Sequence, residues 1–201
     1  MSMSTRRAAL LALHYQNDVV HPHGRIRLGF AEGDAGREAV LGAAERLLAG
    51  ARETAVPVVH VRIAFRPDHA DVLRNGPIWE NVVHVSALAE GSWGASFHDR
   101  LRPQPHEMVV RHGRVNAFFG APLDETLRLF DTEDLVLAGV ATNSVVEHTA
   151  RHAADMGYRV TVAADACAAS RPELHRAALD NVALIGAVAA VDDIVAGWRA
   201  A

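Results

Sequence analysis

The chain contains a single cysteine, Cys167, among its 201 residues. One cysteine excludes a disulfide within the chain, and it leaves no Cys-x-x-Cys pair of the kind that holds structural zinc. Because reduced thiols are typical of intracellular proteins, we expect a cytoplasmic location. Cys167 follows the end of a predicted strand, and we interpret it as a buried structural thiol.

Long apolar runs and blocks of like charge are also missing. The segment Met1 to Arg7 precedes only six apolar residues before His14, which is too few for a spanning helix and a poor match to a signal peptide. The net charge of -4 is spread along the chain, so we expect no basic patch for nucleic acid or for an anionic membrane. These absences favour a small-molecule substrate, with neither a nucleic-acid nor a membrane partner.

Half of the residues are apolar, which is enough for one sizeable core. We expect a single domain over residues 1–201. Apolar runs of strand length alternate with segments of helical periodicity, which is typical of a three-layer α/β fold with a doubly wound, mostly parallel sheet. The predicted strands cover 8–13, 56–61, 107–110, 134–138 and 159–164, and the predicted helices cover 36–54, 122–130, 143–157, 170–181 and the segment after 191.

A long connection, 62–94, follows the second predicted strand. Connections of this length in a compact domain usually serve as lids or as contacts between subunits. Arg62 and Trp79 lie in it and are candidate pocket residues. For Trp79, packing or a subunit contact is the alternative interpretation.

The stretch 135–150 is typical of a strand that passes through a tight turn into a helix. Four apolar residues precede Gly139, and Thr142 or Asn143 then offers a helix cap before the apolar pair Val145 and Val146. A turn of this kind directs helix N-terminal amides into the cleft beyond the strand, where they can hold an anion or a developing oxyanion. We therefore place the function at this turn.

The same stretch, Gly-Val-Ala-Thr-Asn-x-x-Val followed by Thr-Ala-Arg-x-Ala, resembles the signature of the isochorismatase-like cysteine hydrolases. The resemblance implies a Rossmann-like α/β fold, a homodimer or homotetramer, and hydrolysis without a cofactor. In that family a nucleophilic cysteine stands three residues after the threonine. Here Val145 stands at that place.

Two further catalytic positions of the family also differ. The family has Asp-x-Gln-Asn-Asp after its first strand, with the first Asp as general base, and this chain begins the same motif with His14. The family's lysine precedes the first phenylalanine of Lys-x-Arg-x-Ser-Ala-Phe by six residues. Counting back from Phe118 gives His112, and a slip of one residue gives Arg111. Val19 replaces a usual aromatic residue.

A valine cannot act as a nucleophile, so no covalent intermediate is expected. His14 and His112 each follow a strand end, where ligands bind in open α/β sheets, and one cleft can contain both. An imidazole titrates near neutrality and can give or take a proton, as the aspartate does in relatives that hydrolyse a vinyl ether without the cysteine. We predict His-based hydrolysis or elimination on a small carbonyl-bearing or cyclic molecule.

The rival interpretation is a catalytically inactive protein that binds a small ligand or has a regulatory or structural role. A metal site is a further alternative, because His21 and His23 stand two residues apart near His14. No Asp-x-His pair accompanies them, and we expect neither metal nor cofactor.

The candidate substrate-binding residues share a position at the turn or in the loops that face it. For Ser144 the alternative is a hydrogen bond to the helix backbone, because neighbours on a helix point about 100° apart. His148, one turn beyond Val145, is a candidate for the pocket rim. The candidates are Val19, Arg62, Trp79, Val140, Ala141, Ser144 and Val145.

Overall fold

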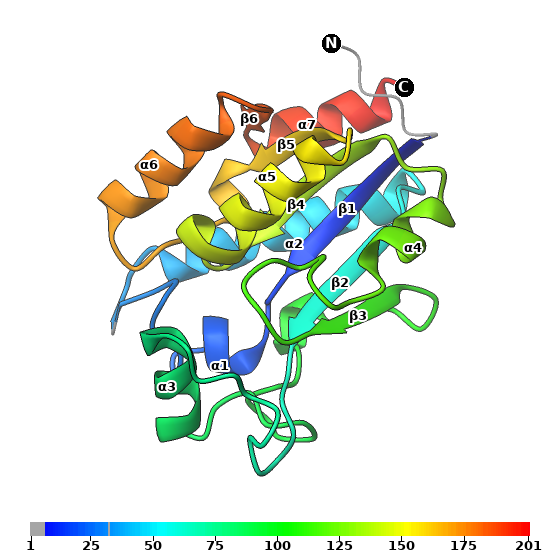
Figure 1. The fold of residues 1–201 in the computed structure, drawn as a ribbon. Coiled ribbons are helices and arrows are strands. Elements are labelled where there is room, and N and C mark those ends of the chain that lie inside the picture. Colours follow the sequence, from blue (N-terminus) through cyan, green and yellow to red (C-terminus); the bar gives the residue numbers. More distant parts are fainter. Residues whose placement is uncertain (1–6, 32) are drawn as a thin grey trace.

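The computed structural model describes residues 7–31 and 33–201. Six strands form one parallel sheet in the order β3-β2-β1-β4-β5-β6, with helices on both faces (Figure 1). The predicted three-layer α/β fold is therefore confirmed. The strands are β1 Ala8–Leu13, β2 Val58–Ile63, β3 Met108–His112, β4 Asp134–Gly139, β5 Arg159–Ala163 and β6 Ala187–Ala189.

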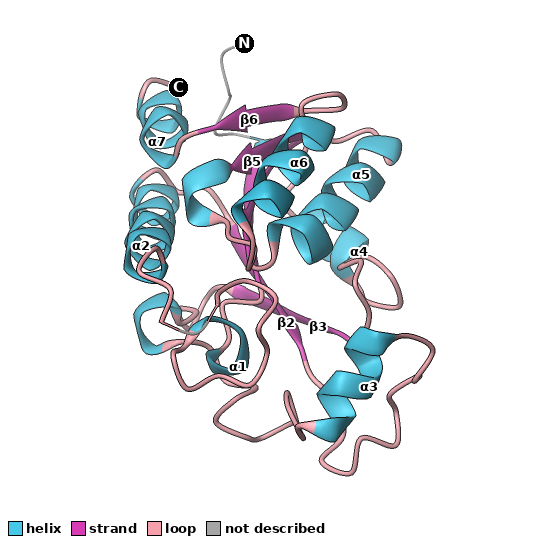
Figure 2. Cartoon of the chain, turned by 90° about the vertical axis from the view of Figure 1, so that its left-hand side faces the viewer, coloured by secondary structure: helices cyan, strands magenta, loops and turns pink. Residues whose placement is uncertain are grey.

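The helices are divided between the two faces of the sheet. Figure 2 shows α2 and α7 on one side and α4, α5 and α6 on the other, whereas α1 and α3 lie below the sheet. The helices are α1 Asn17–Val20, α2 Arg37–Glu53, α3 Pro77–His84, α4 Leu123–Arg128, α5 Glu147–Asp155, α6 Pro172–Val182 and α7 Val191–Arg199.

Strand β1 lies at the centre of the sheet and is buried along its whole length. Ala8, Leu10 and Ala12 pack in the same core as α2 and α7. Ala9, Leu11 and Leu13 belong to a second core on the opposite face, with residues of α4 and α5. Burial on both faces explains why this strand is continuously apolar rather than alternating.

The order of the strands reverses between β1 and β4, which are hydrogen-bonded neighbours. From β1 the chain continues outward to β2 and β3, and from β4 it continues outward to β5 and β6 on the other side. The loops that leave β1 and β4 therefore separate, and they leave a crevice beyond the carboxyl ends of the two strands.

Several predicted boundaries need correction. β2 extends to Ile63 and β3 extends to His112, so Arg62 lies in a strand and not in the long connection. α3 and β6 were not predicted, because α3 is short and β6 has three residues with mostly exposed side chains. α6 begins at Pro172, two residues later than predicted, and it has no side-chain cap at its N-terminus.

No helix formed by residues 7–31 or 33–201 is long and apolar enough to cross a lipid bilayer. Residues 1–6 lie outside the described residues. The expectation that the N-terminal segment is neither a spanning helix nor a signal peptide therefore stays a prediction.

Candidate active site

The turn after β4 has the shape that the sequence predicts, but a different cap. Gly139 has a φ of 155°, and a Cβ atom there would lie 2.2 Å from the carbonyl oxygen of Leu13, so only glycine fits. A π-helical turn, Thr142–Val146, then leads into α5. Thr142 does not cap it, because its Oγ1 lies 2.8 Å from Nδ1 of His175 on α6.

His14 follows the last residue of β1 and turns the chain out of the sheet. Its backbone is left-handed, with a φ of 57°, and its N–H donates to the carbonyl of Val61 at 2.9 Å. A histidine in this conformation costs on the order of 1 kcal/mol, and such strain is concentrated at functional sites. The side chain is buried and lines the largely apolar pocket described below.

His112 is the last residue of β3, and its ring meets the ring of His14. The two Nε2 atoms are 2.5 Å apart, and Nδ1 of His112 lies 3.2 Å from the carbonyl oxygen of Asn116. A carbonyl oxygen only accepts, so Nδ1 of His112 carries a proton and Nε2 of its neutral ring does not. His14 therefore donates from Nε2, and its Nδ1 is the unprotonated nitrogen.

This unprotonated nitrogen is not sealed in the core. Nδ1 of His14 has no hydrogen-bond partner in residues 7–31 and 33–201. In that part of the chain, four side-chain N or O atoms are fully buried and have no hydrogen-bond partner: Arg37 Nε, His60 Nδ1, Thr132 Oγ1 and Trp198 Nε1. Nδ1 of His14 is not one of them. The geometry thus gives the pocket one accessible basic atom.

Burial changes the titration that the sequence predicts for this pair. It lowers the pKa of His14 well below 6.5, and the neighbouring His112 lowers it further. Burial also lowers the pKa of His112 to about 4, although the contact with Asn116 acts in the opposite direction. Both rings are neutral at pH 7, so the expectation of titration near neutrality is corrected.

The pocket occupies the crevice beyond β1 and β4, and the space in it that no protein atom fills is about 450 Å³ with the open solvent at its mouth included. Its wall is mainly aliphatic, and it brings together parts of the chain that are far apart in sequence. The lining residues are His14, Val19, Ile26, Leu28, Ile63, Ile78, Trp79, Val82, Leu88, Arg114, Val115, Val140, Ala141 and Ser144.

Five of the predicted substrate-binding residues line this pocket: Val19, Trp79, Val140, Ala141 and Ser144. Val19 comes from α1, Trp79 from α3, and the other three from the turn after β4. The side chain of Trp79 is nearly completely buried, so it acts as both packing and pocket wall. Binding of substrate by these residues stays a prediction.

Val145 is placed differently from the prediction. Its side chain is 1% exposed and packs in the core on the face of α4 and α5, whereas the preceding Ser144 lines the pocket. Consecutive helical residues diverge by about 100°, so the two side chains cannot share one direction. His148 also lies outside the pocket and borders a shallow groove with Ser144 and Arg151.

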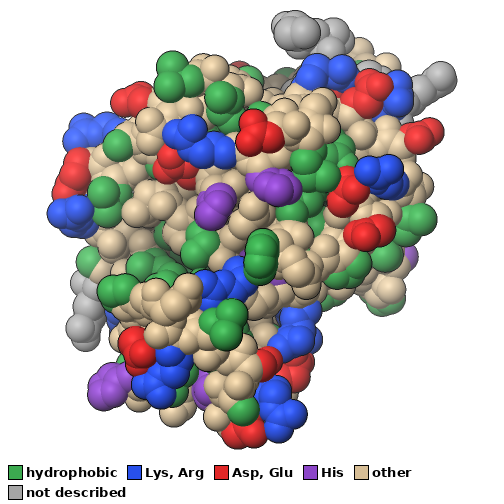
Figure 3. All heavy atoms as spheres, viewed as in Figure 1, with side chains coloured by type: hydrophobic (Ala, Val, Ile, Leu, Met, Phe, Trp, Pro, Cys, Tyr) green, Lys and Arg blue, Asp and Glu red, His purple; other side chains and the backbone are tan. Residues whose placement is uncertain are grey.

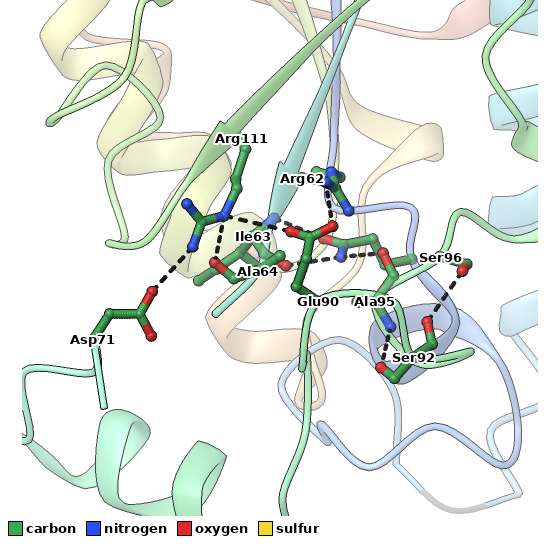
Figure 4. A network of polar contacts seen from close by, with 10 residues as sticks. Arg62, Ile63, Ala64, Asp71, Glu90, Ser92, Ala95, Ser96 and Arg111 are labelled. Carbon is green, nitrogen blue, oxygen red and sulfur yellow. Dashed lines mark hydrogen bonds and ion pairs between the residues drawn. The ribbon is translucent and has the colours of Figure 1, made fainter. Parts of the chain in front are cut away.

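Arg62 does not line the pocket either. Its guanidinium donates to Glu90 at 2.7 Å, and Arg111 lies between the same carboxylate and Asp71 (Figure 4). Arg111 also donates to the carbonyl of Ala64. This network ties the long connection to the ends of β2 and β3, and it leaves His112, not Arg111, in contact with His14.

Arg114 lines the pocket but was not among the predicted site residues. It stands two residues after His112, in the loop that follows β3, and its guanidinium carbon lies 4.2 Å from the centre of the Trp79 ring. Its place in the family motif Lys-x-Arg-x-Ser-Ala-Phe was the available signal. The aliphatic residues from 26–28 and 78–88 had no such signal, because nothing in their local pattern indicates a pocket wall.

The other candidate groups are separate from this pocket. Cys167 is buried, and burial raises the pKa of its thiol to about 12. The rings of His21 and His23 lie 5.3 Å apart, and the ring of Trp93 packs edge-on against His21. Within residues 7–31 and 33–201, no three His, Cys, Asp or Glu side chains are grouped so that they could hold a metal ion.

On the face shown in Figure 3, basic and acidic side chains are interspersed, and no large area carries charge of one sign. Many of the arginines of the described chain are paired with carboxylates, as Arg74 is with Glu80 and Arg151 is with Glu147.

Comparisons with known proteins agree with this fold. The model of the isochorismatase domain matches residues 8–193. Ureidoacrylate amidohydrolase RutB of Methylobacterium radiotolerans is similar, with 33% identity over 187 residues that cover 86% of this chain and 72% of that protein.

Solved structures are similar over nearly the whole chain. A cysteine hydrolase from Pseudomonas syringae pv. phaseolicola has a TM-score of 0.88 at 23% identity, with 100% of this chain and 96% of that one covered. An isochorismatase family protein from Burkholderia thailandensis has a TM-score of 0.80 at 29% identity, with 96% of each chain covered. With its parallel sheet, its crevice beyond β1 and β4 and a matched domain over 8–193, this chain belongs to the isochorismatase family of hydrolases.

Proposed function

We propose that this chain hydrolyses a small carbonyl compound without a cofactor or a covalent intermediate, with His14 as the general base. The observation that carries the proposal is the chain of hydrogen bonds from Asn116 through His112 to His14. It fixes the tautomer of both rings and leaves Nδ1 of His14 free for a proton. A ring held in one tautomer by a second group is the arrangement of many catalytic histidines.

The composition supports a mechanism without the family's usual groups. The chain contains no lysine, and its one cysteine is Cys167, so we assign the family's lysine position to His112. Val145, which we assign to the cysteine position, has no atom that can attack a carbonyl. Water is then the nucleophile, and it needs a base to remove its proton.

In the proposed step, Nδ1 of His14 takes a proton from water while the water oxygen bonds to the carbonyl carbon. The electron pair of the carbonyl bond moves onto its oxygen, which the Ser144 hydroxyl at the pocket wall can stabilise by donating a hydrogen bond. The tetrahedral intermediate then expels the leaving group, which receives the proton from His14. The neutral imidazole pair is restored.

The neutral state of the pair supports hydrolysis over acid-catalysed elimination. A general acid must be protonated before the reaction, and the lowered pKa values of His14 and His112 keep both rings unprotonated at neutral pH. The named activity of the relative, an amidohydrolase, also supports a carbonyl substrate. We further propose the cytoplasmic location and the homo-oligomeric state that the sequence analysis predicts.

The test is turnover of a panel of small amides, carbamoyl compounds, esters and enol ethers, followed by NMR. Wild-type protein is compared with His14→Gln and with His152→Gln, a surface histidine that stacks on Phe118 outside the pocket. We expect hydrolysis that His14→Gln abolishes and His152→Gln retains. Ligand binding without any turnover would instead support the catalytically inactive alternative.

A further inference from the structure

Among the described residues, the pocket wall contains one permanent positive charge, that of Arg114. The other polar groups in this described lining are those of His14, Ser144 and the Trp79 indole N–H. The remaining wall is aliphatic apart from Trp79. Arg114 is half-buried. A charged side chain placed at the edge of an apolar pocket commonly fixes the orientation of a ligand that carries the opposite charge.

The contacts of Arg114 within the described chain are to neutral groups. Its guanidinium lies over the Trp79 ring, and it donates to the carbonyl of Leu73 at 3.2 Å and to Oδ1 of Asn75 at 2.9 Å. No carboxylate of the described residues forms an ion pair with it. Neighbouring arginines differ, since Arg74 and Arg111 pair with acidic side chains.

The guanidinium keeps unused donors. It has five N–H bonds, and the two contacts to Leu73 and Asn75 use one each on Nη1 and Nη2. The three N–H bonds that remain are one on Nη1, one on Nη2 and one on Nε. This planar set matches the two oxygens of a carboxylate, which bind arginine side by side.

We propose that Arg114 binds a carboxylate of the substrate and so makes this protein selective for small monocarboxylates with an apolar or aromatic body. The inference rests on the proposed function only in treating the ligand as a substrate. The apolar body lies against the aliphatic wall and Trp79, and the reacting carbonyl faces His14. The pocket is small, so the ligand is a small molecule.

The main rival is a purely structural role for Arg114. The same contacts connect the loop after β3 to α3 and to the segment of Leu73 and Asn75, and they stabilise the pocket wall. A structural clamp affects all ligands alike, whereas a carboxylate site affects only charged ones. The experiment therefore compares an acid with its neutral isostere.

Isothermal titration calorimetry at pH 7 and low salt measures the binding of benzoate and of benzamide. The proteins are wild type, Arg114→Gln, Arg114→Lys and the control Arg74→Gln. Arg74 lies between Leu73 and Asn75, but it pairs with Glu80. We expect benzoate to bind wild type about 10- to 100-fold more tightly than benzamide. Arg114→Gln removes this preference while benzamide binding changes by less than about threefold, Arg114→Lys is intermediate, and Arg74→Gln behaves as wild type.

Three results overturn the inference: equal losses for both ligands in Arg114→Gln, a preference for benzoate that survives in that variant, or no preference in wild type. His14→Gln separates this inference from the proposed function. If His14→Gln keeps both the benzoate preference and the turnover, the carboxylate site stands and the mechanism fails. If turnover depends on His14 but Arg114→Gln hydrolyses acids and neutral analogues as wild type does, the mechanism stands and the carboxylate site fails.

Discussion

The protein has two buried histidine clusters, and the groups that contact the imidazole rings differ between them. His60 on β2 lies 2.9 Å from the Glu107 carboxylate, which Arg52 of α2 also binds through two hydrogen bonds. His14 and His112 contact each other instead, and no carboxylate joins them. The first cluster is balanced by charges of both signs, whereas the second has no charge at pH 7.

The two clusters also differ in the ring nitrogen that is left over. Nδ1 of His60 has no partner and is completely buried, so no ligand reaches it. Nδ1 of His14 has no partner either within the described chain, but His14 lines a pocket. Burial lowers the pKa of both His60 and His14, so a lowered pKa alone does not identify a functional histidine. Access to the free nitrogen does.

The largest expected effect concerns Nδ1 of His14, in the cluster that lines the pocket. Replacing His14 by Gln keeps a polar side chain of similar size but removes the base, and turnover should fall by about 100- to 10,000-fold. His60→Gln, the matched change in the other cluster, should change kcat per folded molecule by less than about threefold. Steady-state kinetics on both variants, with the folded fraction from circular dichroism, checks this. Equal losses of kcat would remove the distinction between the clusters.

The second prediction concerns stability. Glu107→Gln removes the carboxylate that pairs with both Arg52 and His60, so the free energy of unfolding should fall by about 3 kcal/mol. Glu80→Gln, which breaks an exposed pair with Arg74, should cost less than about 1 kcal/mol. Urea unfolding of both variants measures this difference. Similar costs would show that the buried cluster is no more important than a surface pair.

The third prediction is the response of the catalytic pair to acid. The general base His14 must be neutral, and burial lowers its pKa well below 6.5, so kcat/KM should stay constant from pH 8 down through pH 6.5 and decline only at lower pH. A decline centred at pH 6.5 or above would mean that the pair titrates as ordinary exposed imidazoles do.

Acid should also weaken the fold through the same pair. Between pH 6.5 and about 4 the unfolded chain binds a proton at His112 that the folded chain does not bind. The free energy of unfolding therefore falls as the pH falls through this window, by on the order of 3 kcal/mol for this one group. Urea unfolding of wild type and of His112→Asn over this range measures the contribution of His112. If the free energy of unfolding changed with pH identically in both proteins, the prediction would be contradicted.

The smallest expected effect concerns Cys167, a third buried titratable group. Burial raises the pKa of its thiol to about 12, so thiol reagents at pH 7 should leave activity intact. Cys167→Ala should cost on the order of 1 kcal/mol and leave kcat unchanged. Rapid inactivation by iodoacetamide in wild type, absent in Cys167→Ala, would place this thiol among the reactive groups instead.

Much of the fold follows from local patterns in the sequence. The apolar run of β1, Gly139 after β4 and the helical periodicity of α2 are short-range features, and each was predicted close to its observed bounds. Elements without such features were missed, as β6 was, because three residues beside an already formed sheet need no apolar pattern of their own. The pairing of β6 with β5 decides its structure.

The sequence by itself determined that no lysine exists, that one cysteine exists, and that histidines follow the first and third strands. Tertiary structure decided the rest of the site. It oriented Ser144 into the pocket and Val145 into the core, placed Arg114 on Trp79, and brought His14 against His112. Strand ends 98 residues apart meet only when a parallel sheet aligns them, and the burial that follows sets the charge state of both rings.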